Sequence, residues 1–263
     1  MKKIISKFLI LVFVLTLCFA CKKATEINEE ITIEPQKEEP TKPEETEVWE
    51  PEPKAVSFKA NNVPSDAIVL FDGSNLDAWE SFNNEGQPAD WVLNEDSSMT
   101  VKPGSGDIRT KERFGSIQLH LEWKAPGVIE GEGQGRGNSG VFFQNRYEVQ
   151  ILDSYQNRTY SNGQATSIYK QHIPLVNATK PSTEWQVYDI IFHAPEFDTE
   201  GNKVKSGSFT VIHNGVLVQD HVEILGTTEY IGWPKNEAHG DDFIKLQDHS
   251  NPVSYRNIWL RKL

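Results

Sequence analysis

The chain has 263 residues, a formal net charge of −12 and only two cysteines. This acidic composition, without a basic stripe, argues against nucleic-acid binding. Seven tryptophans and seven tyrosines are typical of a β-protein, and aromatic faces of this kind also stack on the C–H surfaces of sugars.

The first twenty residues have the features of a targeting segment. Lys2, Lys3 and Lys7 precede an apolar run, Phe8 to Leu17, that is too short to span a bilayer. Cys21 follows a loose lipoprotein cleavage box, so we expect residues 1–20 to be a lipoprotein signal peptide and Cys21 to carry the lipid. A plain signal peptide with incidental cysteines is the alternative. Because Cys18 leaves with the signal, the mature chain has no disulfide and no thiolate metal site.

Residues 21–54 are predicted to be a disordered acidic tether. Lys22 to Lys54 contains 11 Glu, 5 Lys and five prolines, and such a segment buries too little apolar surface to offset its chain entropy. An acidic interaction tail is the alternative. Together with Cys21, the tether predicts a protein anchored to a membrane in the cell envelope, in the periplasm or at the outer membrane.

Residues 55–263 form one predicted domain of short strands separated by turns. Ser116 to Trp123 alternates apolar and polar residues, and Asn214-Gly215 is the strongest hairpin signal in the chain. No sustained helical period is present, which predicts an all-β sandwich. The other predicted strands are Ile68–Phe71, Trp91–Leu93, Met99–Val101, Ile108–Thr110, Ser139–Gln144, Tyr147–Asp153, Trp185–His193, Ser208–His213, Val216–Val222 and Arg256–Arg261.

The stretch from Gly131 to Tyr155 carries the best candidate chemistry. Asn145-Arg146 is short enough for a two-residue hairpin between two strands. On the second strand Glu148 and Gln150 share one face, and a bulge near residues 151–152 would bring Asp153 to the same side. Glu148 and Asp153 are the candidate catalytic carboxylates, suited to acid/base work on a sugar. Solvated strand charges or ion-pair partners of nearby arginines are the alternative.

Several polar residues near this stretch are candidate substrate contacts. The glycine-rich loop offers a cation and an amide, and Gln150 is suited to a sugar hydroxyl. His249 in Gln247-Asp248-His249 could donate to a hydroxyl or carbonyl at a cleft rim. Ordinary loops and turns are the alternatives. The predicted substrate-binding set is Arg136, Asn138, Gln150, Gln171, His239, Gln247, His249 and Arg256.

Aromatic and metal-binding candidates are fewer. Trp79 and Trp233 are expected in loops where they could stack on a sugar, whereas Trp185 is expected in the core. His239-Gly-Asp241-Asp242 invites a structural calcium interpretation, but no dense ligand spacing supports it. No cofactor and no metal ligand are therefore predicted.

The residues GRGNSGVFFQNRYEVQILDSY, Gln247-Asp248-His249 and Tyr255 to Arg261 resemble the 3-keto-disaccharide hydrolase domain family, which is common in lipoproteins of Bacteroidetes-like bacteria. The resemblance runs from about Ala67 to the C-terminus. It implies a concanavalin A-like jelly-roll sandwich of two antiparallel sheets, similar to lectins and glucanases. Laminarinase-type glucanases of that fold carry E-x-D-x-E or a bulged E-x-D-x-x-E on one strand. Here Gln150 replaces the central Asp and Asp153 the last Glu, which disfavours ordinary retaining glucanase chemistry.

The resemblance implies an exported enzyme that cleaves 3-keto-glycosides. A carbonyl at C3 acidifies the C2 proton, which Glu148 could remove while Arg136 or His249 stabilises the enolate. The aglycone would leave with help from Asp153, and water would add across the double bond. Direct displacement by two carboxylates stays open, as does a non-catalytic glycan-binding module on the same sandwich.

Overall fold

The computed structural model describes residues 39–263. The predicted signal peptide, Cys21 and the first part of the tether lie outside the described residues. The chain divides between Pro53 and Lys54 into two units. In the first unit, residues 39–53 are exposed and include the 3-10 turn η1 (Pro43–Glu45). In residues 39–263 there is no helix with the length and apolar character that a membrane crossing needs.

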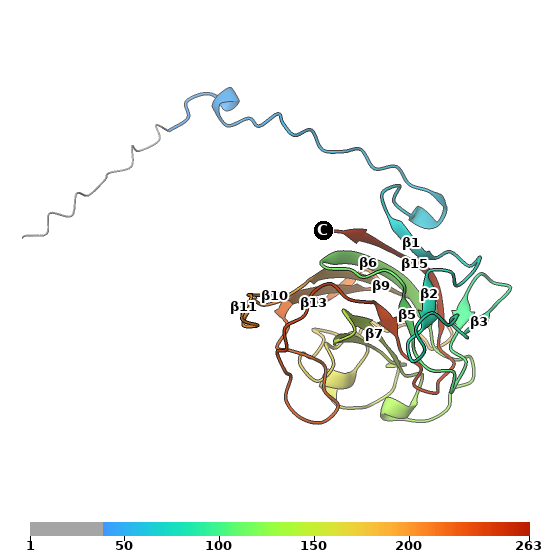
Figure 1. Ribbon diagram of the computed structural model, residues 1–263. Coiled ribbons are helices and arrows are strands. Elements are labelled where there is room, and N and C mark those ends of the chain that lie inside the picture. Colours follow the sequence, from blue (N-terminus) through green and yellow to red (C-terminus); the bar gives the residue numbers. More distant parts are fainter. Residues whose placement is uncertain (1–38) are drawn as a thin grey trace, which may run out of the picture. The chain divides into compact units, whose positions relative to one another are not determined.

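The second unit is built from two large antiparallel sheets (Figure 1). The eight-stranded sheet has the order β13-β12-β9-β6-β15-β4-β3, with β1 also paired to β15, and the five-stranded sheet has the order β2-β5-β14-β7-β8. A small hairpin, β10-β11, stands apart from both. This arrangement confirms the predicted all-β class.

The strands of the second unit are β1 (Ile68–Phe71), β2 (Trp79–Ser81), β3 (Val92–Leu93), β4 (Met99–Thr100), β5 (Ile108–Thr110), β6 (Ile117–Lys124), β7 (Ser139–Phe143), β8 (Tyr147–Ile151), β9 (Gln186–His193), β10 (Glu196–Phe197), β11 (Lys203–Lys205), β12 (Ser208–His213), β13 (Val216–Glu223), β14 (Lys245–Leu246) and β15 (Ser254–Lys262). Further 3-10 turns are η2 (Ala60–Asn62), η3 (Gly133–Gly135) and η4 (Ser161–Gly163).

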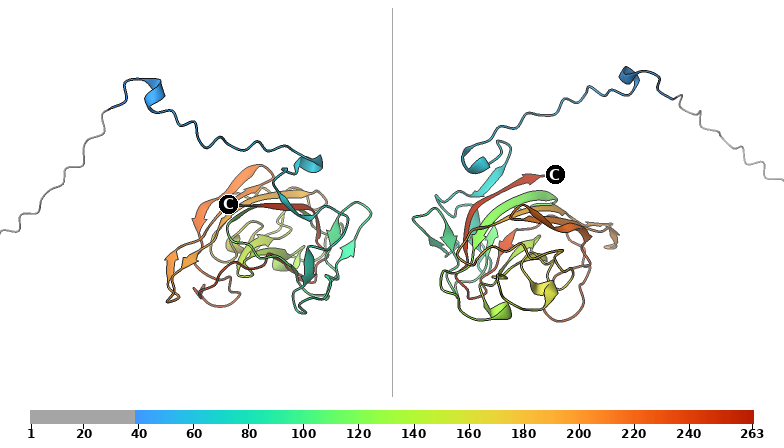
Figure 2. Two further views of the ribbon diagram at one scale, coloured as in Figure 1. Left: turned by 45° about the horizontal axis from the view of Figure 1, so that its top comes forward. Right: turned by 180° about the vertical axis from the view of Figure 1, so that it is seen from behind.

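Alternation of apolar and polar residues decides how the eight-stranded sheet faces the core. In β6 each apolar residue is buried and each polar residue between them is half-buried, as predicted from the sequence. Successive side chains of a strand point to opposite faces, so one face of β6 packs inward and the other faces outward. The two layers can be followed in a tilted view and from behind (Figure 2).

Two hairpin predictions had different outcomes. His213 pairs with Val216 across Asn214-Gly215, so this two-residue turn is confirmed. The turn between β7 and β8 is longer than predicted, because Phe143 pairs with Tyr147 and leaves the three residues 144–146 as the connection.

The hydrophobic core fills the space between the two sheets. Phe143 of β7 packs against Phe192 and Phe209 of the opposite sheet, with ring centroids 5.0 Å apart in both pairs. Trp79 also belongs to this core. It is 1% exposed, and its indole N–H donates to the Leu70 carbonyl, so the expectation that Trp79 stacks on a sugar is wrong. A large aromatic ring that begins an inward-facing strand gains more from burial than from exposure.

Candidate functional site

A row of side chains crosses the outer face of the five-stranded sheet. The cross-strand register places one residue from each strand next to the residue of the neighbouring strand. Residues directly opposite each other in antiparallel strands point to the same face. The row is Glu80 (β2), Arg109 (β5), Lys245 (β14), Phe142 (β7) and Glu148 (β8).

The loop after β8 folds back and extends this row by one residue. Gln150 exchanges backbone hydrogen bonds with Ser167 and Thr166, and the Tyr169 N–H donates to the Glu148 carbonyl at 3.1 Å. An isolated antiparallel bridge joins Val149 to Ile168. Tyr169 therefore lies opposite Glu148 at the edge of the sheet.

A cavity of about 510 Å³ lies over this end of the sheet. The loops after β8 and after β13 contribute residues to its walls, while the sheet itself supplies the floor. Its lining contains one carboxyl group, four side-chain amides, an imidazole, an ammonium group and three phenols. The lining residues are Gln134, Asn138, Phe142, Glu148, Gln150, Tyr160, Tyr169, Lys170, Thr228, Tyr230, Gln247 and His249.

Glu148 is a buried carboxyl group on the floor of this cavity. It is 5% exposed, and no side chain of residues 39–263 donates a hydrogen bond to its carboxylate. Burial raises the pKa of Glu148 to about 8, although the Lys245 ammonium opposes the shift and the Asp107 charge adds to it. Burial without a bonded cation favours the neutral form of an acid. Lys245 is instead held by Asp107, with 3.0 Å between Nζ and Oδ2.

Gly140 leaves the space that the Glu148 side chain occupies. Gly140 pairs with Gln150 on the adjacent strand. A Cβ atom built on Gly140 would lie 2.5 Å from Oε1 of Glu148 and 3.0 Å from the Phe142 ring. Any larger residue at position 140 must displace the carboxyl group.

Gln150 presents an acceptor without a partner. Its Nε2 donates to Oε1 of Gln134 at 2.9 Å, while its own Oε1 is buried and accepts no hydrogen bond within residues 39–263. A buried polar atom without a partner costs free energy.

Three tyrosines surround Lys170 on the other side of the cavity. The Lys170 ammonium lies 4.5 Å from the Tyr230 ring centroid, 5.6 Å from that of Tyr160 and 5.7 Å from that of Tyr169. The Tyr160 and Tyr169 hydroxyls are 2.5 Å apart. Aromatic faces and hydroxyl donors around an amide-rich floor suit a carbohydrate.

Five of the predicted site residues come together in this cavity. They are the candidate catalytic residue Glu148 and the candidate substrate-binding residues Asn138, Gln150, Gln247 and His249. Gln247 lies on the sheet because its N–H donates to the Gly140 carbonyl. Exposed His249 stands at the rim.

Asp153 does not join Glu148, so the predicted geometry is wrong. Strand β8 ends at Ile151, and the Asp153 N–H turns instead to the carbonyls of Arg136 and Gly137. The Asp153 side chain is 2% exposed, and its Oδ2 lies 3.0 Å from Nε of Arg136. Both residues line a different cavity of about 1050 Å³.

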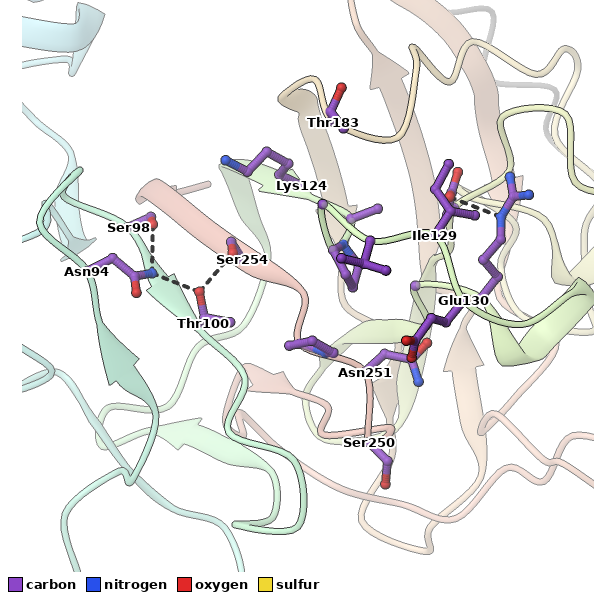
Figure 3. A pocket seen from close by; sticks show the side chains of 18 of the residues that line it. Asn94, Ser98, Thr100, Lys124, Ile129, Glu130, Thr183, Ser250, Asn251 and Ser254 are labelled. Carbon is purple, nitrogen blue, oxygen red and sulfur yellow. Dashed lines mark hydrogen bonds and ion pairs between the residues drawn. The ribbon is translucent and has the colours of Figure 1, made fainter.

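Several polar groups of this larger cavity are bonded to one another. Hydrogen bonds join Ser98 to Asn94, Asn94 to Thr100 and Thr100 to Ser254 along one wall (Figure 3). Its one buried carboxylate, Asp153, is neutralised by Arg136. The smaller cavity holds the raised-pKa carboxyl group, and we therefore take it as the candidate site.

Gln171 and His239 lie outside the candidate site. Gln171 joins two loops, because its Nε2 donates to the Gly226 carbonyl and its Oε1 accepts from Leu225 N–H. Nε2 of His239 lies 2.6 Å from the Tyr147 hydroxyl, and its ring packs against Phe197. Neither residue lines the cavity.

Arg256 lies on the outer face of the eight-stranded sheet. Its Nε donates to Oε2 of Glu122 at 2.7 Å, and its guanidinium lies over the Trp185 ring. It belongs to a set that we call the outer cluster: His120, Glu122, Asp189, Arg256 and Asn257. Arg256 pairs directly with Glu122 across the two strands, and a β-bulge between Arg256 and Trp259 turns Asn257 toward Glu122 as well.

Several residues of the site were not predicted from the sequence. These are Gln134, Phe142, Tyr160, Tyr169, Lys170, Thr228 and Tyr230. The register of β7 against β8 places Phe142, but the loop residues had no periodic pattern. The tyrosine and lysine content of residues 155–172 was the only available signal. Trp233, a predicted stacking residue, is 87% exposed and does not line the cavity.

Within residues 39–263, no three His, Cys, Asp or Glu side chains are grouped so that they could hold a metal ion. Asp242, part of the calcium candidate, is paired with Arg146 at 2.6 Å.

Comparison with known proteins identifies relatives of this chain. A 3-keto-disaccharide hydrolase of Bacteroides thetaiotaomicron is 23% identical over 257 residues, covering 80% of this chain and 84% of the relative. A crystal structure of a protein assigned as a glycosyl hydrolase from Parabacteroides distasonis is 49% identical, with a TM-score of 0.81, and covers 84% of this chain and 97% of that one. Another such structure from the same organism, 22% identical with a TM-score of 0.53, covers 75% of this chain and 99% of that one and shares the fold.

This chain is therefore similar to glycoside hydrolases in both sequence and fold. A family model described as the 3-keto-alpha-glucoside-1,2-lyase-like domain matches residues 66–261. The chain belongs to this family.

Proposed function

We propose that this protein is an enzyme that cleaves 3-keto-glycosides by elimination and hydration, with Glu148 as the base. The observation that carries the proposal is the Glu148 carboxyl group, which lies buried at the bottom of an amide- and phenol-lined cavity with its pKa raised to about 8. The family description and the activity named for the Bacteroides relative support the substrate class.

The first step is removal of the proton at C2. The neighbouring carbonyl at C3 acidifies this proton, and Glu148 accepts it. The electron pair of the C2–H bond forms a C2–C3 double bond, and the C3 oxygen takes the negative charge. A base with a pKa near 8 is stronger than an ordinary carboxylate and is still partly ionised at neutral pH.

The second step expels the aglycone. The enolate reforms the C3 carbonyl, a C1–C2 double bond forms, and the bond from C1 to the aglycone oxygen breaks. Water then adds at C1, and C2 regains a proton. The net reaction consumes one water and equals hydrolysis.

The departing oxygen needs a proton, and Asp153 cannot supply it from the other cavity. In an α-glucoside the C2–H and C1–O bonds lie on opposite faces of the ring. The acid must then stand across the sugar from Glu148. His249 is at the exposed rim of the same cavity, and we assign it this role.

Turnover of keto sugars tests the proposal. The purified full chain is incubated with 3-keto-trehalose and, separately, with trehalose, and product release is followed. We expect turnover of the keto sugar alone, reduced at least about 100-fold by Glu148→Gln because a general base is lost. The matched control is Glu130→Gln, an exposed carboxylate on the larger cavity. Binding of either sugar without turnover would instead support the glycan-binding module.

We also propose that the enzyme is exported and held in the cell envelope by a lipid on Cys21. The N-terminal sequence supports this, since three lysines, an apolar run and a cysteine follow in the order of a lipoprotein signal. Labelled palmitate should be incorporated by the wild type and not by Cys21→Ser. Equal labelling of both would reject the anchor.

A further inference from the structure

We propose that Tyr169 and Tyr160 form the hydrogen-bond donor that stabilises the negative C3 oxygen when Glu148 removes the C2 proton. This inference rests on the function proposed above and names the second half of its first step. It replaces Arg136, which lies on the other cavity and is bound to Asp153.

The position of Tyr169 beside Glu148 supports this role. The Tyr169 N–H is bonded to the Glu148 carbonyl, so Tyr169 is the cross-strand neighbour of the base on the same face of the sheet. Both side chains line one cavity. In a substrate that presents its C2 proton to Glu148, the C3 oxygen is two bonds from C2, so its donor must lie close to Glu148, as the cross-strand neighbour Tyr169 does.

The state of the two hydroxyls is the second support. They lie 2.5 Å apart, so one phenol donates to the other. The accepting phenol keeps its own proton free for a ligand. Burial, above all, raises the pKa of Tyr169, and the hydrogen bond to Tyr160 and the nearby Glu148 charge add to this. Burial also raises the pKa of Tyr160. Both hydroxyls therefore stay neutral at the pH at which Glu148 is ionised, as an enolate donor must.

The rings are fixed before substrate binds. Gly163 lies directly against the Tyr160 ring, where a Cβ atom would come within 2.0 Å of Cε2. Lys170 adopts a left-handed backbone with φ of 60°, donates its backbone N–H to the Asn162 carbonyl and places its ammonium beside both rings. Preorganised donors need no rearrangement as charge develops.

The step is a strengthened hydrogen bond and not a proton transfer. Glu148 gains the C2 proton, the C3 oxygen gains negative charge, and the phenol keeps its O–H bond while donating to that oxygen. Charge on both groups stays balanced, and no further reactant is needed. Loss of one such donor typically slows a reaction about 100- to 1000-fold.

Proton exchange at C2 tests this step without the rest of the reaction. The probe is 1,5-anhydro-3-keto-glucitol, a 3-keto sugar with no leaving group at C1. It is incubated with the full chain in D₂O, and exchange at C2 is followed by proton NMR. We expect Tyr169→Phe and Tyr160→Phe each to slow exchange at least about tenfold with little change in the Kd of the probe. Tyr155→Phe, in the same loop but outside the cavity, is the matched control.

The outcomes separate the two proposals. Rapid exchange by the wild type, lost in Glu148→Gln but unchanged in both phenylalanine variants, would overturn the phenol donor and leave the base in place. Binding of the probe without exchange by the wild type would overturn both. Should Tyr169→Phe fail to fold, Tyr160→Phe still decides the matter, because Tyr160 is 40% exposed.

Discussion

The outer faces of the two sheets both carry paired charges, but Glu148 on the five-stranded sheet differs from Glu122 and His120 on the eight-stranded sheet. On the eight-stranded sheet, Oδ1 of Asp189 lies 2.7 Å from Nδ1 of His120, and Glu122 accepts hydrogen bonds from Asn257 and Arg256. On the five-stranded sheet, Glu148 is buried without a hydrogen bond to its carboxylate from residues 39–263.

The pKa shifts of the two faces follow from this difference. Burial alone would lower the pKa of His120, but hydrogen bonds to Asp189 and Glu122 raise it to about 9. Burial would raise the pKa of Glu122, but hydrogen bonds, first from His120 and then from Asn257 and Arg256, lower it to about 2. In the outer cluster both groups are thus held in their charged forms.

Glu148 shows the reverse, since burial raises its pKa to about 8 and holds the carboxyl group partly neutral. A shifted pKa by itself therefore does not mark a catalytic group. The outer cluster stabilises the fold because its charges are paired. The buried carboxyl group costs stability and gains reactivity.

The largest effect on activity should come from a change that moves Glu148, the buried carboxyl group that has no hydrogen-bonding partner in the described part of the chain. Gly140→Ala must displace the Glu148 carboxyl group, because the new Cβ atom would lie 2.5 Å from Oε1. Displacement by about 1 Å can cost about 100-fold in rate, and we expect a loss of kcat of that size on 3-keto-trehalose. Gly127→Ala, which meets no atom within 4 Å, is the control and should retain its kcat. Full activity of Gly140→Ala would mean that Glu148 does not act from this position.

A smaller effect should appear in the pH dependence. Glu148 must be ionised to act as a base, and its pKa in the folded protein is about 8. The rate of C2 proton exchange in 1,5-anhydro-3-keto-glucitol, which has no leaving group to protonate, should therefore rise about tenfold between pH 7 and pH 9 and then level off. Enzyme-catalysed exchange rates over this range measure the rise, and the residual exchange of Glu148→Gln should not show it. Exchange that falls as the pH rises would show that Glu148 does not act as the base.

The smallest effect should be a change in stability caused by a substitution in the outer cluster, whose charges are paired. His120 has a folded pKa of about 9, above its ordinary value of 6.5. Its charge therefore stabilises the fold fully below pH 6.5, and this stability is lost as the pH rises through 9. His120→Gln should lower the free energy of unfolding by about 1–2 kcal/mol at pH 6 and by less at pH 9.5.

Urea denaturation at the two pH values measures this difference. Turnover of 3-keto-trehalose should not change, because the outer cluster lies on the opposite sheet. A loss of turnover in a folded His120→Gln protein would show that the two faces are coupled.

The candidate site was only partly accessible from the sequence. Glu148 and Gln150 could be placed on one face because a strand has a fixed period of two. Asp153 could not, since the end of β8 depends on whether its backbone bonds to the sheet or to Arg136 and Gly137. Arg256 was wrongly assigned to the site for a similar reason. Its strand could be predicted from neighbouring residues, but the sheet that this strand joins depends on distant parts of the chain. The tyrosines became visible only when residues 166–169 were seen to pair with β8.

The sequence by itself determined the all-β class, the alternation of β6, the turn at Asn214-Gly215 and the carboxylate-amide pair on β8. Each of these features depends on residues that are close together in the sequence. Backbone geometry alone then decides which face of a strand a side chain points to and where the chain turns. Tertiary structure alone decided which charges are paired and which are buried unpaired. Glu122 and Glu148 are both polar residues alternating with apolar ones in a strand. The residues that surround each of them come from distant parts of the chain. These surroundings lower the pKa of Glu122 to about 2 and raise that of Glu148 to about 8.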